Sequence, residues 1–455
     1  MTVPAVDDDR LAAVFKAYDI RGTVPEQLDE DLARGVGAAF ARYVSSQAVL
    51  VGRDMRPSGD GLLEAFADGV TATGTDVIDL GLASTDLVYA AAGAFDLPAA
   101  MLTASHNPAG YNGIKLCGPG AAPIGIDSGL GDIRSMAAAG TEAGPVRGSR
   151  STLDFLPDYV AHVHSFVDVE ALAPLRVVAD CANGMGGLVA PAVFAGLPVE
   201  VELMYPELDG TFPNHPADPI DPANLRDLQA RVLQTGADLG LAFDGDADRV
   251  FLVDEQARPV SGSLTTSLVA KGVLQREPGA TILHNLICSR AVPEIVRELG
   301  GIPVRTKVGH SYIKADMADT GAAFGGEHSG HYYFRDNYRA DSGLIASLVV
   351  FEQLSAAGCP MSELLAPLDR YAASGEVNTV VDDRAGAIEA VAAAYHERPQ
   401  DRLDGLTVDC GDWWFNLRPS NTEPLLRLNL EAPDADAVAR HVAEVRAVFA
   451  QPPRR

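Results

Sequence analysis

The chain has 455 residues, and its 35 Lys and Arg against 62 Asp and Glu give a formal net charge of −27. Apolar side chains make up 47% of the residues and charged ones only 21%, so we expect a large buried core and about three or four domains. The strong acidity argues against nucleic acid or an anionic membrane as a partner, because each phosphate contact needs a Lys or Arg.

The cysteines and the N-terminal segment both bear on the compartment of the protein. Five cysteines are scattered without a CxxC pair, which is typical of reduced thiols and not of a disulfide framework. The opening MTVPAVDDDR has an acidic run and no apolar stretch, so it predicts neither a secretory signal nor a transmembrane span. We therefore expect a cytoplasmic protein.

One order of predicted elements recurs along the chain: an apolar strand entering a polar loop, a helix, a second strand, and a third strand ending in a polar cluster. The first unit has strands at Ala48–Val51, Asp76–Leu80 and Ala99–Leu102, the last of them before TASHNP, and a helix at Gly59–Thr73. Ser58 is the expected cap of this helix.

The second and third units repeat this order with different clusters. The second has strands at Leu175–Ala179, Val199–Met204 and Leu239–Phe243, the last before DGDADR. The third has a strand at Thr281–Leu283, a helix near Pro293–Leu299 and a strand that ends at Val304. Its last strand, Ala322–Phe324, comes before GGEHSG. Open α/β sheets bind ligands at the carboxyl ends of their strands, so three clusters at equivalent ends predict one site. Glycine-rich turns that merely connect elements are the alternative.

The pattern changes after about Ser374. The predicted elements there are strands at Glu376–Val381, Leu406–Asp409, Trp413–Leu417 and Leu425–Leu430, a helix at Ala385–His396 and a final helix. The predicted fold class is α/β, with three similar α/β domains with mixed sheets and a smaller C-terminal α+β domain. The expected domains are 1–150, 151–255, 256–368 and 369–455, with a linker around Gly140–Thr152.

The second cluster has the spacing of a metal site. Asp244, Asp246 and Asp248 alternate in a strand-like context, so the three carboxylates can share one face. They repel one another unless a cation lies among them, and oxygen-only ligands favour Mg²⁺ or another hard divalent ion. An EF-hand does not fit, because its glycine position holds Arg249 and the flanks are strand-like. A solvated acidic turn is the alternative.

The first cluster places Ser105, His106, Asn107 and Pro108 directly after an apolar strand. Taken alone, Ser105 or Asn107 could cap a helix that begins at Pro108. A serine-hydrolase dyad is disfavoured, since neighbours in the chain rarely point at each other and no G-x-S-x-G elbow is present. A serine that carries a phosphoryl group beside the metal would use both clusters.

Two further loops have compositions that suit a phosphosugar. The loop Arg418–Pro424, RPSNTEP, combines a guanidinium, hydroxyls and an amide that can bind phosphate, although an ordinary hairpin connection is the alternative. In GEHSG, Glu327 and Ser329 fit a vicinal pair of sugar hydroxyls. The lone histidines His328 and His310 are of a kind that is more often packed or solvated than catalytic.

These motifs resemble those of the α-D-phosphohexomutases, most closely the phosphomannomutase/phosphoglucomutase branch. The motifs that match, in order over nearly the whole chain, are KAYDIRG, GRDMRPSG, TASHNP, NGIK, DGDADR, KVGH, GEHSGH and RPSNTEP. The resemblance implies four domains around a central cleft, with Ser105 as the phosphorylated serine. It also implies Mg²⁺ bound by Asp244, Asp246 and Asp248 together with Ser105 and its phosphate.

The same resemblance assigns the remaining roles. It implies sugar selection by Glu327 and Ser329, and it makes Ser105, His106, Lys115, Arg21 and Arg249 catalytic, without deciding whether Lys115 or His106 is the general acid or base. The implied substrate-binding residues also include Tyr18, His310 and the distal phosphate clamp of Arg418, Ser420, Asn421 and Thr422. The clamp lies on a separate domain, which we expect to swing about a hinge near Leu368–Ser374.

The implied reaction interconverts hexose 1-phosphate and hexose 6-phosphate through a 1,6-bisphosphate, which is also the expected activator. The expected partner is a small phosphosugar, with mannose first and glucose close behind. A phosphoglucosamine mutase is a less favoured alternative, because His328 stands where that branch usually has Gln. A metal-dependent sugar phosphatase that uses the same serine would also fit these motifs. A phosphosugar sensor without turnover is disfavoured, because TASHNP and DGDADR are intact. No oligomeric state is predicted.

Overall fold

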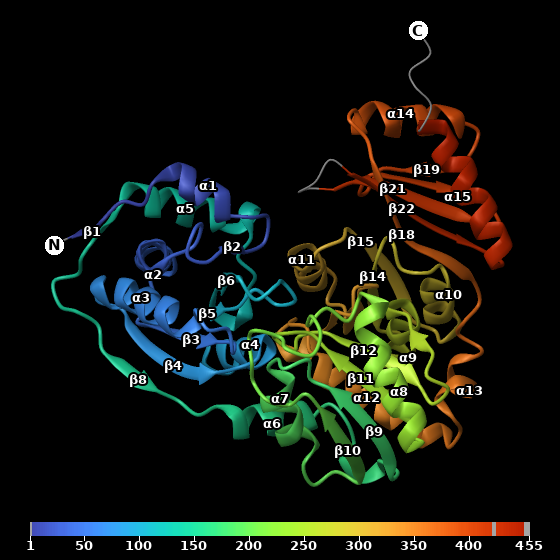
Figure 1. Ribbon diagram of the computed structural model, residues 1–455, viewed down its shortest axis with the longest axis horizontal. Coiled ribbons are helices and arrows are strands. Elements are labelled where there is room, and N and C mark those ends of the chain that lie inside the picture. The colour runs from blue at the N-terminus through green and yellow to red at the C-terminus, as the bar shows by residue number, and fades with distance from the viewer. Residues whose placement is uncertain (1, 421–424, 450–455) are drawn as a thin grey trace.

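The computed structural model describes residues 2–420 and 425–449, and within them four large sheets divide the chain (Figure 1). The first sheet has the order β2-β6-β5-β3-β4-β8. Its central strands are parallel, whereas β6 pairs antiparallel with both β5 and β2, so the sheet is mixed. These strands are β2 (Ile20–Thr23), β3 (Ala48–Arg53), β4 (Asp76–Leu82), β5 (Ala99–Leu102), β6 (Tyr111–Cys117) and β8 (Arg150–Thr152).

Helices cover the first sheet. The predicted cap of one of them, Ser58, makes no capping hydrogen bond through its side chain. The helices are α1 (Asp8–Val14), α2 (Glu30–Val44), α3 (Gly59–Ala72), α4 (Thr85–Phe95) and α5 (Leu130–Ala139). Asp29 caps α2 and Ser84 caps α4 through side-chain hydrogen bonds to the backbone. Ser58 lies at the N-cap position of α3 but makes no such bond, and its hydroxyl accepts a hydrogen bond from Asn112 Nδ2 at 2.9 Å.

The second and third sheets repeat the mixed arrangement of the first. Their orders are β10-β9-β11-β12-β13 and β15-β14-β16-β17. The strands are β9 (Leu175–Asp180), β10 (Val199–Met204), β11 (Leu239–Phe243), β12 (Val250–Asp254), β13 (Pro259–Val260), β14 (Thr281–Asn285), β15 (Ile302–Thr306), β16 (Phe324–Gly326) and β17 (Tyr332–Phe334). The helices are α6 (Leu156–His164), α7 (Gly186–Phe194), α8 (Arg226–Thr235), α9 (Gly262–Arg276), α10 (Ala291–Glu298), α11 (His310–Thr320), α12 (Gly343–Ala357) and α13 (Met361–Leu365).

Each predicted polar cluster is the connection between a strand and its antiparallel neighbour. TASHNP joins β5 to β6, DGDADR joins β11 to β12, and GGEHSG joins β16 to β17. In all three sheets the first strand of this pair also has a parallel neighbour on its other side. The prediction of three similar α/β units, each with a polar cluster after its third predicted strand, is therefore confirmed.

The segment expected as a linker is partly built into the first sheet. Within it, β7 (Thr141–Glu142) pairs with β1 (Thr2–Val3), and β8 pairs with β4. Strand pairing at a sheet edge uses backbone groups, so it does not need the apolar periodicity that the segment lacks. Because β8 and β13 extend the first and second sheets to Thr152 and Val260, we propose domains that include these strands.

The C-terminal domain is an antiparallel sheet with two helices, as the sequence predicts. The sheet order is β18-β22-β21-β20-β19. Its elements are β18 (Ala372–Val380), β19 (Gln400–Asp401), β20 (Leu406–Asp409), β21 (Trp414–Pro419), β22 (Leu425–Ala432), α14 (Arg384–Ala394) and α15 (Ala435–Phe449).

The hydrophobic cores show which domains are tied together. One continuous cluster joins residues of α4, β11 and α12, including Val88, Phe243 and Leu348. The C-terminal domain has a cluster of its own around Phe415 and Leu428. A domain with a separate core can move as a unit, which agrees with the hinge expected before it. Among the described residues, no helix is long and apolar enough to cross a membrane.

We predict that Gly69→Ala strongly destabilises the first domain. A Cβ at Gly69 would lie 2.0 Å from Arg34 O, because α3 and α2 approach each other there by backbone contact. Separating two packed helices costs about 1–3 kcal/mol, so the melting temperature of the variant should fall. The matched control is Gly131→Ala on α5, where the nearest atom would be Ile126 O at 3.6 Å. Equal melting temperatures of the two variants would contradict this prediction.

Candidate active site

Ser105 lies in the turn between β5 and β6 with a left-handed backbone, at a φ of +48°. Thr103 Oγ1 holds this uncommon conformation by accepting a hydrogen bond from Ser105 N at 2.9 Å. The chain continues into a strand, so the helix-cap alternative does not hold. The aspartate loop packs directly against this turn, since a Cβ at Gly245 would lie 2.4 Å from Ser105 O.

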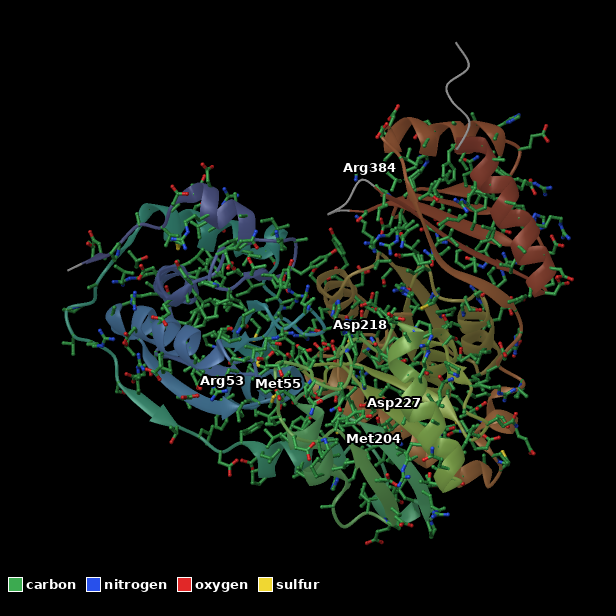
Figure 2. All side chains as sticks on the ribbon, in the orientation of Figure 1. Arg53, Met55, Met204, Asp218, Asp227 and Arg384 are labelled. Atoms are coloured by element: carbon green, nitrogen blue, oxygen red, sulfur yellow. The ribbon has the colours of Figure 1, made fainter. Side chains whose placement is uncertain are left out.

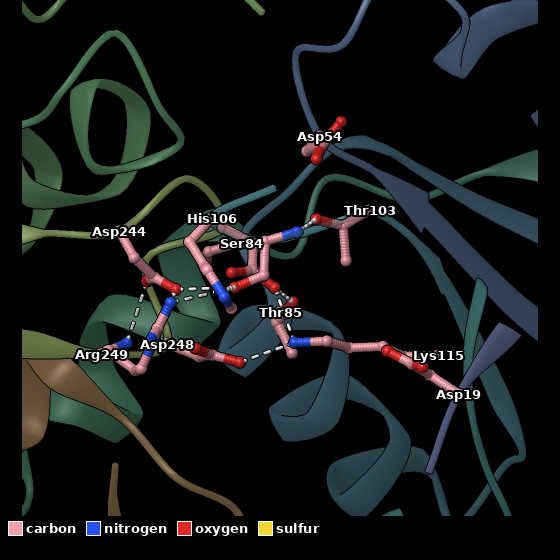
Figure 3. A network of polar contacts seen from close by, with 12 residues as sticks. Asp19, Asp54, Ser84, Thr85, Thr103, His106, Lys115, Asp244, Asp248 and Arg249 are labelled. Atoms are coloured by element: carbon pink, nitrogen blue, oxygen red, sulfur yellow. Dashed lines mark hydrogen bonds and ion pairs between the residues drawn. The ribbon is translucent and has the colours of Figure 1, made fainter. Parts of the chain in front are cut away.

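The three predicted aspartates share one buried face beside this serine (Figure 3). One carboxylate oxygen from each of Asp244, Asp246 and Asp248 lies within 4.8 Å of the others. Ser105 Oγ donates a hydrogen bond to Asp244 Oδ2 at 2.8 Å, so the two clusters form a single site. A solvated acidic turn is excluded, because all three side chains are buried.

Two cations from different domains partly offset these carboxylates. Lys115 Nζ donates to Asp246 Oδ2 at 2.7 Å and to Asp248 Oδ2 at 2.8 Å, while Arg249 Nε donates to Asp244 Oδ2 at 2.8 Å. Burial, opposed by Arg249 and helped by the neighbouring carboxylates, raises the pKa of Asp244 to about 7. Burial would also raise the pKa of Asp246, but the charge of Lys115 lowers it well below its usual range.

The residues present fit a divalent cation. Asp246 Oδ1 and Asp248 Oδ1 are buried and have no hydrogen-bond partner among the described residues. A buried acceptor without a partner is costly unless a cation or donor meets it. Three carboxylates against two cations also leave a negative charge uncompensated. Oxygen ligands of this kind suit a hard ion such as Mg²⁺, and these three aspartates would hold it.

His106 and Arg21 complete the polar surroundings of the serine. His106 Nδ1 lies 3.3 Å from Ser105 Oγ. Burial, followed by the positive charges of Arg249 and Arg21, lowers the pKa of His106 to about 2, so its ring is neutral near neutral pH. Arg21 NH1 donates to Asn107 Oδ1 at 2.5 Å, and its other terminal nitrogen pairs with Asp19. The structure therefore brings these predicted residues to the serine loop.

Arg56 organises the serine loop, and the sequence patterns did not predict it. Its guanidinium is fully buried and donates hydrogen bonds to backbone carbonyls of the loop. The acceptors, at 2.6 to 2.8 Å, are the carbonyl oxygens of Ser105, Asn107, Pro108 and Tyr111. Asp54 Oδ2 accepts from Arg56 Nε at 3.2 Å. The signal that could have found it is its place in GRDMRPSG, a polar loop after a buried strand.

The third loop places Glu327 among donors at the end of β16. Tyr333 OH donates to Glu327 Oε1 at 2.7 Å, while Asn285 Nδ2 and Gly309 N donate to Oε2 at 3.0 and 3.2 Å. Burial lowers the pKa of the adjacent His328 to about 3. Glu327 is therefore a fixed acceptor, and neither Asn285 nor Tyr333 was predicted from the sequence.

A cavity of about 1500 Å³ lies between the domains and has lining residues from all four. Those predicted as site residues are Tyr18, Ser329 and Arg418. Burial raises the pKa of Tyr18 to about 12. Ser105 and the three aspartates are not among the lining residues, whereas Ser329 and Arg418 bring the predicted sugar and phosphate loops to the same cavity.

The C-terminal loop supplies cations to this cavity. Arg418 and Arg427 both line it and both pair with Glu376, at 3.2 and 3.5 Å. Arg384, labelled in Figure 2, donates through NH1 to Ser420 O at 2.9 Å. Asn421 and Thr422, predicted as part of the clamp, lie outside the described residues, as does the side chain of His310.

Comparison with known proteins matches the whole of this architecture. The phosphoglucomutase/phosphomannomutase alpha/beta/alpha domains I, II and III match residues 12–142, 157–258 and 261–371, and the C-terminal domain matches 376–448. The chain belongs to the phosphoglucomutase/phosphomannomutase family, and it is an isomerase of the phosphohexomutase class.

Individual relatives span nearly the full length of the chain. It is 42% identical to the phosphohexose mutases protein of Xanthomonas campestris pv. campestris over 95% of each chain. It is 40% identical to a phosphomannomutase of Salmonella montevideo over 92% of this chain and 94% of that one. A solved family structure from Burkholderia thailandensis superposes with a TM-score of 0.88 at 35% identity and covers 96% of each chain.

We predict that Arg56→Lys lowers kcat by about 100-fold, because a misplacement of about 1 Å at a reacting group costs about that factor. A lysine has no planar fork and cannot reach the carbonyls that Arg56 bonds. Steady-state kinetics and a thermal melt would measure the change. Arg34→Lys, at a surface ion pair on α2, is the matched control. An Arg56→Lys variant with unchanged kcat would show that the loop does not depend on this guanidinium.

Proposed function

We propose that this chain interconverts hexose 1-phosphates and 6-phosphates, with mannose phosphates first and glucose phosphates second, through a phosphorylated Ser105. The observation that carries this proposal is the contact of Ser105 Oγ with Asp244 Oδ2 at 2.8 Å inside a buried site. A hydroxyl so placed, beside cations and a neutral histidine, suits phosphoryl transfer, which depends mainly on position and charge neutralisation.

The proposed cycle balances over two transfers. In the first, a hydroxyl oxygen of the sugar phosphate attacks the phosphorus on Ser105, a new O–P bond forms, the Ser105 Oγ–P bond breaks, and the hydroxyl loses its proton. The product is a hexose 1,6-bisphosphate, which turns over in the cleft. In the second, Ser105 Oγ attacks the phosphorus of the other phosphate, a new Oγ–P bond forms and the sugar O–P bond breaks. The proton that Ser105 Oγ gained in the first transfer ends on the released sugar oxygen. No phosphate is lost to water.

His106 and Lys115 differ in the proton that each can handle. Burial disfavours the charged form of Lys115, but Asp246 and Asp248 raise its pKa well above the usual value, so it is protonated. It serves as a proton donor or as a fixed positive charge. His106 is neutral and lies 3.3 Å from Ser105 Oγ, so it is a hydrogen-bonding partner of the serine and does not add positive charge. Arg249 NH2, at 3.5 Å from Ser105 Oγ, and Arg21 stabilise negative charge.

Mg²⁺ is the proposed metal, and hexose 1,6-bisphosphate the proposed activator. When bound, the ion neutralises charge on the transferred phosphoryl group. Asp244, Asp246 and Asp248 supply its protein oxygens, together with Ser105 and its phosphate. A phosphoserine brings a charge of about −1.5 to −2, which adds to an already negative site and favours a divalent partner.

The sugar and its distal phosphate are assigned to the cavity. A carboxylate offers about four acceptor positions. Three donors of the described chain already use those of Glu327, so it can accept from one sugar hydroxyl and Ser329 can bind its neighbour. Arg418 and Ser420 hold the distal phosphate, with Asn421 and Thr422 as proposed partners. Tyr18 and His310 complete the proposed binding residues.

We also place the protein in the cytoplasm. All five cysteines carry free thiols, and four of them are buried. Thiols in this state suit a reducing compartment, where phosphosugars are also the expected small-molecule partners.

Mannose 1-phosphate should be converted into mannose 6-phosphate without release of inorganic phosphate. A coupled assay for the 6-phosphate, run beside a phosphate assay, measures both outcomes, and free phosphate as the main product would support a phosphatase.

Intact mass should show one phosphate on the protein and none on Ser105→Ala. That variant should lose at least about 1000-fold in activity, because it lacks the carrier oxygen.

Asp246→Ala should remain folded but lose metal-dependent activity, because it removes one of three metal oxygens and leaves Lys115 paired with Asp248 alone. The measurements are activity against Mg²⁺ concentration and a thermal melt. Glu200→Ala, which changes the charge equally at an exposed strand position, is the control. Full turnover in Asp246→Ala would refute the metal assignment.

A further inference from the structure

Thr85, at the first position of α4, reaches from the first domain onto the aspartate loop of the second (Figure 3). Its Oγ1 donates a hydrogen bond to Asp246 Oδ2 at 2.5 Å, and its backbone N donates to Asp246 O at 3.1 Å. Both residues are fully buried. The side chain and backbone of one residue therefore hold the same aspartate at two points.

These contacts determine which oxygen of Asp246 stays available. Oδ2 accepts from Thr85 Oγ1 and from Lys115 Nζ, whereas Oδ1 is buried without a hydrogen-bond partner in the described part of the chain. Two donors on one oxygen restrict rotation of the carboxylate, so Oδ1 remains directed away from both donors. Groups that orient a metal ligand in this way tune metal affinity without touching the ion.

The next residue, Asp86, ties Thr85 to all three large domains. Its carboxylate accepts hydrogen bonds from Ser84 and from Tyr159 on α6. It also accepts one at 2.8 Å from Oγ of Ser342, the residue that caps α12. Leu87 N adds a fourth donor at 2.9 Å to Asp86 Oδ1. The group is fully buried, so this set of donors is what makes its burial tolerable.

The contacts around Ser342 extend to the other side of the proposed metal cluster. The preceding residue, Asp341, pairs with His331 Nδ1 at 2.6 Å, and the same nitrogen lies 3.9 Å from Asp248 Oδ1. Neighbouring residues at 341 and 342 thus contact both Asp86 and the histidine that faces Asp248. The start of α4 and the start of α12 are therefore fixed to each other next to the aspartate loop.

We propose that Thr85 and Asp86 are positioning residues for the metal site: Thr85 orients Asp246, and Asp86 holds Thr85 in place by joining the first domain to the second and third. This inference rests on the metal site proposed above. It assigns to the domain junction a role in cation binding that is separate from its role in stability.

The decisive comparison is Thr85→Val against Thr85→Ser. Valine keeps the branched shape and removes the hydroxyl donor, whereas serine keeps the donor. Titration of the purified protein with Mn²⁺, followed by electron paramagnetic resonance of the free ion, measures affinity without turnover. Thr85→Val should bind Mn²⁺ about 10- to 100-fold more weakly, which is the usual cost of losing a group that supports a metal ligand, and Thr85→Ser should restore most of the affinity.

Asp86→Asn tests whether the two residues act together. If Asp86 works through Thr85, the double variant Thr85→Val with Asp86→Asn should bind Mn²⁺ no more weakly than Thr85→Val alone. Additive losses would overturn the role of Asp86. If Asp86→Asn does not fold, Tyr159→Phe, which removes one donor to the same carboxylate, replaces it in this cycle.

The outcomes separate this inference from the proposed function. If the wild type binds Mn²⁺ and Thr85→Val binds it equally well, the positioning role is wrong and the metal site stands. If the wild type binds no divalent ion, both are wrong. Equal weakening in Thr85→Val and Thr85→Ser would also overturn the inference, because it would show that packing and not the hydroxyl matters.

Discussion

The burial of three carboxylates on one short loop is the constraint on which the rest of this structure depends. Asp244, Asp246 and Asp248 are all buried, and such a group is strongly unfavourable unless positive charge and hydrogen-bond donors surround it. Lys115 comes from the first sheet and Arg249 from the aspartate loop itself. These two cations face three acidic side chains, which together could hold a metal ion.

The domain arrangement follows from bringing loops to that cluster. Each of the first three sheets contains a strand paired with an antiparallel neighbour, and the turn between the two strands carries predicted site residues. One continuous hydrophobic core packs these three sheets against one another. This packing holds Ser105 in contact with Asp244. The fourth domain has its own core and carries Arg418 on the far side of the cavity. The serine–aspartate cluster and the predicted phosphate clamp therefore belong to parts of the chain with separate hydrophobic cores.

Local patterns predicted much of this, for a physical reason. The strands at Ala99–Leu102 and Leu239–Phe243 have the bounds that their apolar runs predict, because buried parallel strands must be continuously apolar. The aspartates and Ser105 were predicted to form one site because both follow the carboxyl ends of equivalent strands, where α/β sheets bind ligands. Ser58 lies at the predicted cap position but makes no side-chain bond to the helix, and its hydroxyl instead accepts from Asn112, a partner distant in the chain. Arg56 was missed because its acceptors are backbone carbonyls, which leave no mark in residue types.

By itself, the amino-acid sequence determined the chemistry available to this protein: three alternating carboxylates, a serine after a buried strand, and a C-terminal loop with a guanidinium, two hydroxyls and an amide. Residue type and spacing are enough for that, since they set charge, donors and the face on which a strand presents its side chains. Only the tertiary structure decided which groups became partners, such as Thr85 with Asp246 and Asp86 with Ser342. These pairs are far apart in the chain, and their hydrogen bonds exist only because the packed domains bring together atoms that no local pattern connects.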